Sequence, residues 1–155
     1  MTAKPLYGMS RLIRGAALQL SARPAVGDEG STVVATYVLS PGLGRPELLL
    51  ADCRFAAARE GWAVSREFYD LTGGDAVLSL LPQWAEVRQL VHRRQIDGIV
   101  VADRLHVAVD GAAYTALEEW ALTNRTFVHF LSDSGGVFGD NHLIGRRPDT
   151  AEVAQ

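Results

Sequence analysis

Short runs of apolar residues alternate along the chain with longer segments of helical spacing. In residues 32–39 and 99–102, β-branched, aromatic and apolar side chains follow one another without polar alternation. Such uniform strands are typical of a parallel sheet that helices cover on both faces. Two further runs, 62–69 and 126–131, also read as strands. We therefore predict about four strands, with 32–39 and 99–102 adjacent and central.

Three segments with apolar residues at three- and four-residue spacing separate these strands. They cover about residues 47–60, a helix that begins at Pro82, and about 111–123. In the first, the predicted apolar face consists of Leu48, Ala51, Phe55 and Ala58. In the other two, the residues expected to point inward are Trp84, Val87, Leu90, Val91, Tyr114, Leu117 and Ala121.

The alternation of strands and helices predicts the fold class. It implies βαβ units with right-handed crossovers, and hence a three-layer α/β/α domain with a mostly parallel central sheet. The 155 residues are enough for one domain with its own core. We assign residues 32–131 to this domain, 1–31 to an N-terminal extension and 132–155 to a polar C-terminal tail.

Composition narrows the function classes. The formal net charge is −3, with 15 Lys and Arg against 18 Asp and Glu. A surface that binds nucleic acid usually carries a basic excess, so DNA binding is expected to be weak or to need a partner. All basic residues except Lys4 are arginines, which is typical of a GC-rich bacterial genome and weakens any argument from the presence of an arginine.

Cofactor and membrane signals are missing from the sequence. Cys53 is the only cysteine, and the four histidines show no metal-ligand spacing to one another. We therefore predict no disulfide, no metal and no cofactor. No signal peptide and no apolar run of membrane-spanning length is found, so a cytoplasmic protein without membrane contact is expected.

Candidate chemistry lies at the carboxyl ends of the two central strands. The strand 99–102 is followed by Asp103 and Arg104, and the strand 32–39 is followed by Ser40. Ligand and catalytic groups gather at this edge of open α/β sheets. Ser40, Asp103 and Arg104 are therefore the candidate site residues. A charged pair in this position can also simply mark the end of a strand.

Five segments, in order between about residues 33 and 131, resemble the catalytic domain of serine recombinases, the resolvase/invertase family. Tyr37-Val38-Leu39-Ser40 resembles the family's Tyr-x-Arg-Val-Ser, and Cys53 to Ala57 with Gly61-Trp62 resembles its helix end and strand start. Asp70 to Gly74 is similar to Asp-x-x-Ser-Gly, and Leu81 to Trp84 is similar to Arg-Pro-x-Trp. Ile96 to Leu105 resembles the strand that leads into Asp-Arg-Leu-x-Arg.

This resemblance implies a resolvase-like fold and a known chemistry. Family members cut DNA by attack of a serine hydroxyl on a phosphodiester, which leaves a phosphoserine link. Ser40 stands at the position of the nucleophile, and Asp103 and Arg104 stand at family positions. If the chain is an enzyme, the resemblance implies phosphoryl transfer of this type.

The departures from the family pattern concern its charged and polar groups. Tyr37 and Ser40 are one residue too close, so the first-strand arginine is either replaced by Val38 or deleted. Each lost cationic donor costs roughly 3 kcal/mol of transition-state stabilisation. The positions concerned are Val38, Leu81 and Val107 in place of arginines, Leu49 near the family's glutamine, and Gly73 in place of a serine.

We therefore hypothesise a degenerate serine recombinase-like domain that has lost strand cleavage and serves as a protein-interaction module, with a second copy as one partner to consider. Ser40 then reads as a strand-end turn serine. Trp84, Trp120 and Tyr114 could contribute to an interface, although core packing is the favoured role for each.

Two alternatives remain open. The first is an active or partner-dependent site-specific recombinase that uses Ser40, with Arg45 or Arg14 in place of the missing arginines. The second is a domain that binds a small ligand or phosphate at the sheet's carboxyl edge. In that case Ser40, Gly42, Gly44 and the pair Gly73-Gly74 would supply the loop donors.

Overall fold

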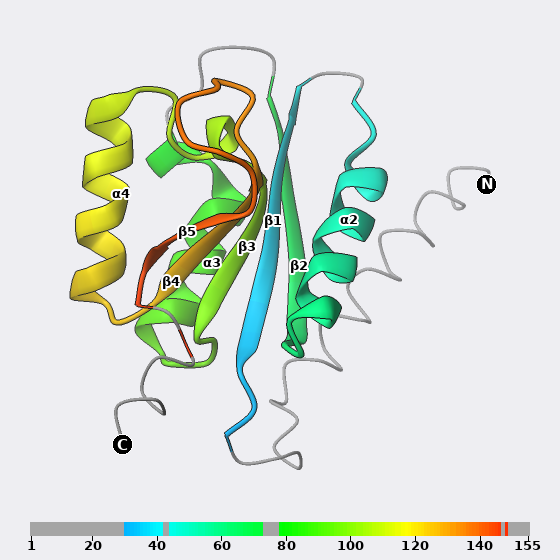
Figure 1. Cartoon of the computed structure of the whole chain (residues 1–155), viewed down its shortest axis with the longest axis vertical. Helices are drawn as coiled ribbons and strands as arrows, with labels where there is room; N and C mark the ends of the chain where they lie inside the picture. The colour runs from blue at the N-terminus through cyan, green and yellow to red at the C-terminus, as the bar shows by residue number, and fades with distance from the viewer. Residues whose placement is uncertain (1–29, 42–43, 73–77, 147, 149–155) are drawn as a thin grey trace, which may run out of the picture.

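A five-stranded sheet forms the centre of the computed structural model, which describes residues 30–41, 44–72, 78–146 and 148 (Figure 1). The strand order is β2-β1-β3-β4-β5; β1 to β4 run parallel, and β5 runs antiparallel to β4. The strands are β1 (Val33–Pro41), β2 (Ala63–Thr72), β3 (Gly98–Asp103), β4 (Phe127–Ser132) and β5 (His142–Gly145). The helices are α2 (Pro46–Arg59), α3 (Pro82–His92) and α4 (Gly111–Thr123), with short 3₁₀ helices η1 (Leu78–Leu80) and η2 (Arg104–His106).

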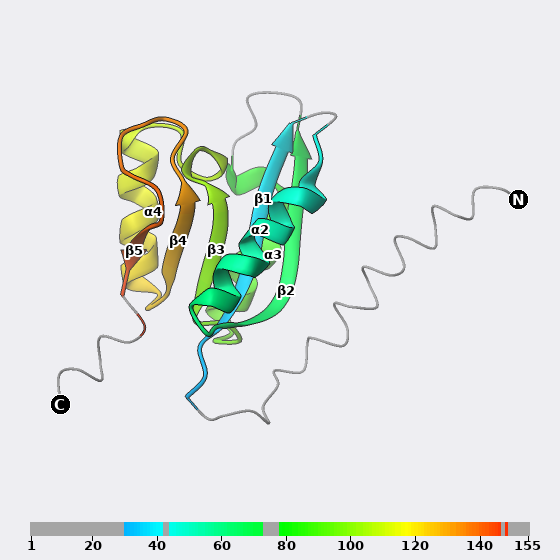
Figure 2. The same cartoon turned by 45° about the vertical axis from the view of Figure 1, so that its right-hand side comes forward.

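Helices cover the sheet from both sides (Figures 1 and 2). Val34 and Val38 of β1 pack against Leu50 and Cys53 of α2 on one face. On the other face, the neighbouring positions of β1 and β3 form a second core with α3 and α4. The predicted three-layer α/β/α fold with a mostly parallel sheet is confirmed. The two most apolar strands, β1 and β3, are adjacent and central, as predicted.

The sheet has one strand more than the sequence predicts. The fifth strand, β5, lies within the segment 132–155 that was interpreted as a polar tail. It is four residues long, and only Leu143 and Ile144 in it are apolar. Its own pattern is too short to signal a strand; pairing with β4, where His129 lies opposite Leu143, holds it in place. Of the predicted N-terminal extension, residues 1–29 lie outside the described part of the chain.

The first two strands extend beyond their apolar runs. Ser40 lies within β1, where it pairs with Leu71, and Asp70 lies within β2. The interpretation of Ser40 as a turn serine is therefore wrong, and β2 continues to Thr72, beyond the predicted run 62–69. Parallel hydrogen bonding between the two strands keeps them paired as far as Pro41 and Thr72.

The predicted apolar face of the first helix is also wrong. The buried residues of α2 are Pro46, Leu50, Cys53 and Ala57. Leu48 and Phe55, which were expected on the apolar face, are 57% and 64% exposed. Both sides of this helix carry apolar residues, so periodicity alone does not decide which side faces the sheet. The inner row is rich in small side chains, which allow the helix to approach the strands closely.

Candidate functional site

Asp103 ends β3 and joins three parts of the carboxyl edge. Its carboxylate accepts hydrogen bonds from the Leu105 backbone N–H at 2.9 Å, from the Ser132 hydroxyl at 2.8 Å, and from the N–H and hydroxyl of Ser134. Burial acts to raise the pKa of Asp103, but these hydrogen bonds, led by that of the Ser134 hydroxyl, outweigh it and hold the pKa below its usual value. The carboxylate is therefore ionised and engaged in fixing the loop after β4.

Arg104 points into the protein, although it opens η2 directly after the strand. Its guanidinium donates from Nε to Oδ1 of Asp133 at 2.9 Å and from Nη1 to the carbonyl of Ala108. The two side chains of this ion pair are only 4% and 1% exposed. The ring of Phe138 lies 5.7 Å from the guanidinium carbon, and a Cβ at Gly135 would come within 2.4 Å of Nη2. The cation is thus enclosed by the loop after β4.

Asp133 holds this loop against Arg104. Besides Arg104, its carboxylate accepts hydrogen bonds from the backbone N–H groups of Gly135, Val137 and Phe138, at 2.9, 3.1 and 2.6 Å. Burial opposes ionisation, but the hydrogen bond from Phe138, together with Arg104, lowers the pKa of Asp133 below its usual value. The charges of Arg104 and Asp133 cancel each other within the protein.

Ser40 lies apart from both of these groups. Its side chain is 1% exposed, and among the described residues no hydrogen bond joins it to Asp103 or Arg104. Side chains alternate along a strand, so Ser40 shares the α2 face of the sheet with Val38. Asp103 pairs with Ser132, two residues after Phe130, which places Asp103 on the opposite face. The structure does not bring the three sequence-predicted residues together as a nucleophile with its supporting groups.

Strand alternation also separates Ser40 from Tyr37. A Tyr-x-Arg-Val-Ser pattern puts its tyrosine, arginine and serine on one face of a strand, since they are two residues apart. Here Tyr37 packs into the core on the α3 face, opposite to the face of Ser40. With the tyrosine as reference, the family's serine position falls on Pro41, which has no hydroxyl.

The remaining family arginine positions lie in the hydrophobic core. Val38 packs against α2, while Leu81 and Val107 belong to the core cluster on the other face. All three side chains are buried. Arg45, one suggested replacement, is exposed at the N-cap of α2. The other suggested replacement, Arg14, lies outside the described residues, as do the loop glycines Gly42, Gly73 and Gly74.

The family-like residues that the chain keeps have structural partners. The Tyr37 hydroxyl donates to Oδ2 of Asp70 at 2.8 Å, and burial raises the pKa of Tyr37 far above its usual range, with a further contribution from Asp70. Asp70 also accepts the backbone N–H groups of Gln83 and Trp84, both at 3.1 Å, and so caps α3. The Trp84 ring lies edge-on to Tyr37 at 5.0 Å. Three of the five matched segments meet in this network.

Trp84 is buried in the core, and Trp120 and Tyr114 are partly buried against it. This agrees with core packing as their main role.

His106 is a polar residue near the site that the sequence analysis did not single out. Its Nδ1 accepts a hydrogen bond from the Leu39 backbone N–H at 3.3 Å, one residue before Ser40. Burial lowers the pKa of His106, and nearby Asp103 opposes this only in part. The ring is therefore neutral at pH 7, with its proton on Nε2. Since the Nδ1 lone pair is occupied, no lone pair is left to accept a proton from Ser40.

Asp133 and Ser134 were also missed, because they lie in the segment assigned to a polar tail. Their position in the sequence could have indicated them, because they directly follow β4 and so lie at the same carboxyl edge of the sheet as Asp103.

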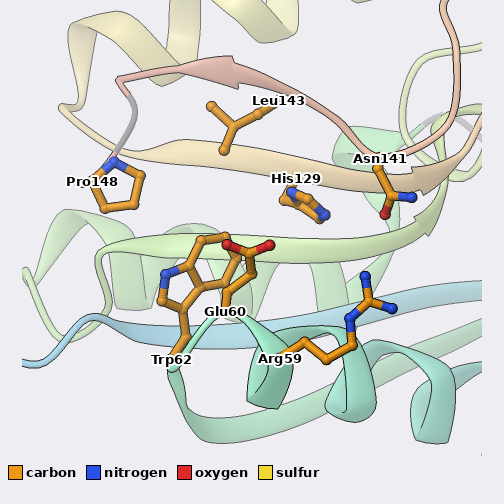
Figure 3. A pocket seen from close by; sticks show the side chains of 7 residues that line it. All are labelled: Arg59, Glu60, Trp62, His129, Asn141, Leu143 and Pro148. Carbon is orange, nitrogen blue, oxygen red and sulfur yellow. The ribbon is translucent and has the colours of Figure 1, made fainter. Parts of the chain in front are cut away.

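A cavity of about 200 Å³ lies elsewhere, beside the C-terminal end of α2 (Figure 3). The Trp62 ring lies edge-on to His129 of β4, with 5.5 Å between the centroids. The cavity is lined by Arg59, Glu60, Trp62, His129, Asn141, Leu143 and Pro148. It contains none of the three sequence-predicted site residues.

Other reactive groups do not add to the carboxyl edge. Cys53 is buried on the side of α2 that faces the sheet, and burial, with Asp52 and Glu67, raises the pKa of its thiol to about 12. In the described part of the chain, no group of three or more His, Cys, Asp or Glu side chains is placed to hold a metal ion. No helix among the described residues has the length and apolarity needed to cross a membrane.

Comparison with known proteins supports the fold. The structure is similar to the crystal structure of the N-terminal catalytic domain of TP901-1 integrase, with a TM-score of 0.55 and 18% sequence identity. The alignment covers 64% of this chain and 75% of that chain. No protein-family model and no curated protein matches the sequence. The chain therefore has a serine recombinase-like fold, and at this identity the similarity is evidence of fold alone.

Proposed function

We propose that this domain is a degenerate serine recombinase-like module that does not cleave DNA and acts through protein contacts. The observation that carries the proposal is the position of Arg104. Its guanidinium is buried and bonded to Asp133 and to the Ala108 carbonyl. A phosphodiester transition state needs cationic donors aimed at its oxygens, and this cation is aimed at a carboxylate of the protein instead.

The surroundings of the other family positions agree with this proposal. An arginine at Val38, Leu81 or Val107 would have to be buried in an apolar core, which is costly without a paired charge. Ser40 is buried, and among the described residues the Nδ1 lone pair of the neighbouring His106 is already occupied, so neither an activating base nor access to a substrate is provided there. Covalent trapping on nicked DNA tests the proposal: wild-type protein should give no adduct linked to Ser40.

An interaction role is supported by the apolar side chains that α2 presents to solvent, among them Leu48 and Phe55. Direct DNA binding is not expected to supply the function, because the net charge is −3. Fluorescence anisotropy with duplex DNA at physiological salt should therefore show at most weak binding. Sub-micromolar affinity would favour the alternative of a partner-dependent recombinase.

A further inference from the structure

The cavity of about 200 Å³ lies between the C-terminal end of α2 and the strands β4 and β5 (Figure 3). The helix packs on β1, β2 and β3. Beyond it, β4 and β5 present His129 and Leu143, which lie opposite each other, on the same side of the sheet. The cavity is therefore bounded by the helix end and by two strands, and neither Asp103 nor Arg104 lines it.

The last turn of α2 sets the direction of three lining residues. The helix closes with a Schellman motif, in which the Trp62 N–H donates to the Ala57 carbonyl at 2.9 Å. Gly61 takes the left-handed conformation that this motif requires, with a φ of +79°. The chain therefore reverses directly after the helix, and Arg59, Glu60 and Trp62 all border the same cavity.

Trp62 forms an apolar wall that is in place without a ligand. Its ring packs on Phe127 with 4.9 Å between the centroids, and it lies edge-on to the buried ring of His129 at 5.5 Å. Leu143 and Pro148 extend the apolar lining. Walls that are already formed reduce the ordering cost that a ligand must offset on binding.

The charged groups follow one another along the cavity. In Figure 3, the Arg59 guanidinium and the Asn141 amide lie at one end, and Trp62 and Pro148 lie at the other. The Glu60 carboxylate lies between the two ends. Among the described residues, no ion pair joins Arg59 to Glu60, so neither charge is cancelled by the other. The cavity thus offers an apolar end, a carboxylate and a cationic end, in that order.

The volume of the cavity limits the ligand to a small molecule. A dry cavity of about 150 Å³ holds a benzene molecule. Drug-sized ligands occupy pockets of about 300–1,000 Å³. At about 200 Å³, this cavity fits one ring or one branched chain with a few polar atoms, and it is too small to enclose a nucleotide.

We propose that this cavity binds a free α-amino acid with an apolar side chain about the size of one ring. The ligand carboxylate accepts hydrogen bonds from Arg59 and from the Asn141 amide, since a guanidinium matches a carboxylate with two parallel N–H donors. The ligand ammonium donates to Glu60, where the negative end of the α2 dipole adds to the attraction. The side chain packs against Trp62 and Leu143. This binding function goes beyond the interaction role proposed above and uses other residues.

Charge balance favours a zwitterion over other small ligands. Arg59 and Glu60 carry opposite charges at the same cavity. A ligand with only an anionic group leaves Glu60 unpaired beside it, and a ligand with only a cationic group leaves Arg59 unpaired. The Arg59 guanidinium also lies over the Phe55 ring at 5.8 Å, and this aromatic contact leaves its N–H groups available to a carboxylate.

A ¹H–¹⁵N NMR titration of the full chain with L-phenylalanine tests the proposal. A dissociation constant on the order of 0.1–1 mM is expected for a ligand of this size, with the largest shifts at the Trp62 indole and the Asn141 amide. Two analogues keep the ring and lack one charge each: 3-phenylpropanoate has no ammonium, and 2-phenylethylamine has no carboxylate. Each should bind about tenfold more weakly than L-phenylalanine, because one charge of the cavity stays unpaired.

Two single variants should reverse this preference. In Glu60→Gln, 3-phenylpropanoate should bind at least as tightly as L-phenylalanine, and in Arg59→Gln, 2-phenylethylamine should do so. Both residues are exposed, so the core is not disturbed. The matched controls are Glu86→Gln in α3 and Arg93→Gln directly after it, at exposed positions of the helix that packs on the opposite face of the sheet. They should leave all three affinities unchanged.

Asn141→Gly tests the carboxylate end without changing a charge. Asn141 has a φ of +55°, a conformation that glycine adopts without strain, so the change removes the amide and keeps the backbone. L-phenylalanine should bind this variant several times more weakly, whereas 2-phenylethylamine should bind it as it binds the wild type.

Three results would overturn the proposal. The first is the absence of any shift at up to about 20 mM L-phenylalanine. The second is wild-type protein that binds 3-phenylpropanoate or 2-phenylethylamine as tightly as L-phenylalanine. The third is a preference that Glu60→Gln and Arg59→Gln leave unchanged. None of these results bears on the loss of cleavage, and a covalent DNA adduct would overturn the loss of cleavage without changing this titration.

Discussion

The Nε atom of Arg104 lies 2.9 Å from Oδ1 of Asp133, in an ion pair that is almost completely buried. Arg104 is the one cation that the family resemblance places at the carboxyl edge, and its charge is neutralised by the loop that follows β4. Removing one partner of a buried pair leaves an uncompensated charge, which costs far more than losing an exposed pair. The first prediction uses this difference.

Arg104→Met should lower the free energy of unfolding several times more than Arg54→Met does. Arg54 is a matched control, since it also pairs with a carboxylate, Glu67, but at the surface, where such a pair contributes under about 1 kcal/mol. Urea denaturation of the two variants and the wild type measures the difference. Equal, small effects would mean that Arg104 is not held by Asp133 in solution and is available to a ligand.

A pH dependence of stability is expected from His106. Burial lowers the pKa of His106 in the folded protein below the unfolded value of about 6.5. At pH values between these two pKa values, the unfolded chain therefore binds more protons than the folded protein. The stabilising contribution is therefore fully present above that unfolded value and is lost as pH falls through 6.5 toward the folded pKa. His106→Asn should flatten the unfolding free energy over this range, whereas His92→Asn, at an exposed site, should not. An unchanged profile in His106→Asn would contradict the assignment.

Gly98, at the start of β3, is predicted to be intolerant of any side chain. A Cβ there would lie 2.2 Å from Cζ of the buried Phe127 ring. Gly98→Ala should cost roughly 1–3 kcal/mol of stability through overpacking, and Phe127→Leu in the same protein should recover part of it. Gly111→Ala is the control, because a Cβ at that position would meet no atom within 4 Å apart from its chain neighbours and the nearby backbone of its own helix. Chemical denaturation that finds Gly98→Ala as stable as wild type would show that Phe127 does not pack there.

The sequence was sufficient to predict the layers of the fold, but not the side chains that share a site. The uniform apolarity of β1 and β3 identified them as central strands, because a strand that is buried on both faces carries apolar side chains at nearly every position. It could not orient α2, whose two sides are both apolar, so Leu48 and Phe55 were assigned to the wrong side. The strand β5 was missed since it depends on pairing with β4 rather than on its own residues.

The candidate site could be predicted only as far as its edge of the sheet. Asp103 and Arg104 do lie at the carboxyl end of a central strand. The direction of the Arg104 side chain depends on Asp133, 29 residues later in the chain, and no local pattern connects the two. The resemblance to the family motif also did not reveal that Ser40 and Tyr37 lie on opposite faces of β1. The spacing between them is one residue shorter than in the motif, and a shift of one residue moves the serine to the other face of the strand.

The most direct test of the loss of cleavage is the mass of the protein after incubation with nicked duplex DNA of randomised sequence. The nick lets the cut strand diffuse away, so a phosphoserine link would be trapped as an increase in the intact mass of the protein. We predict that wild-type protein and Ser40→Ala both show only the mass of the unmodified chain, even at high DNA concentration. A mass increase that matches a cleaved strand in wild type and is absent from Ser40→Ala would contradict the account.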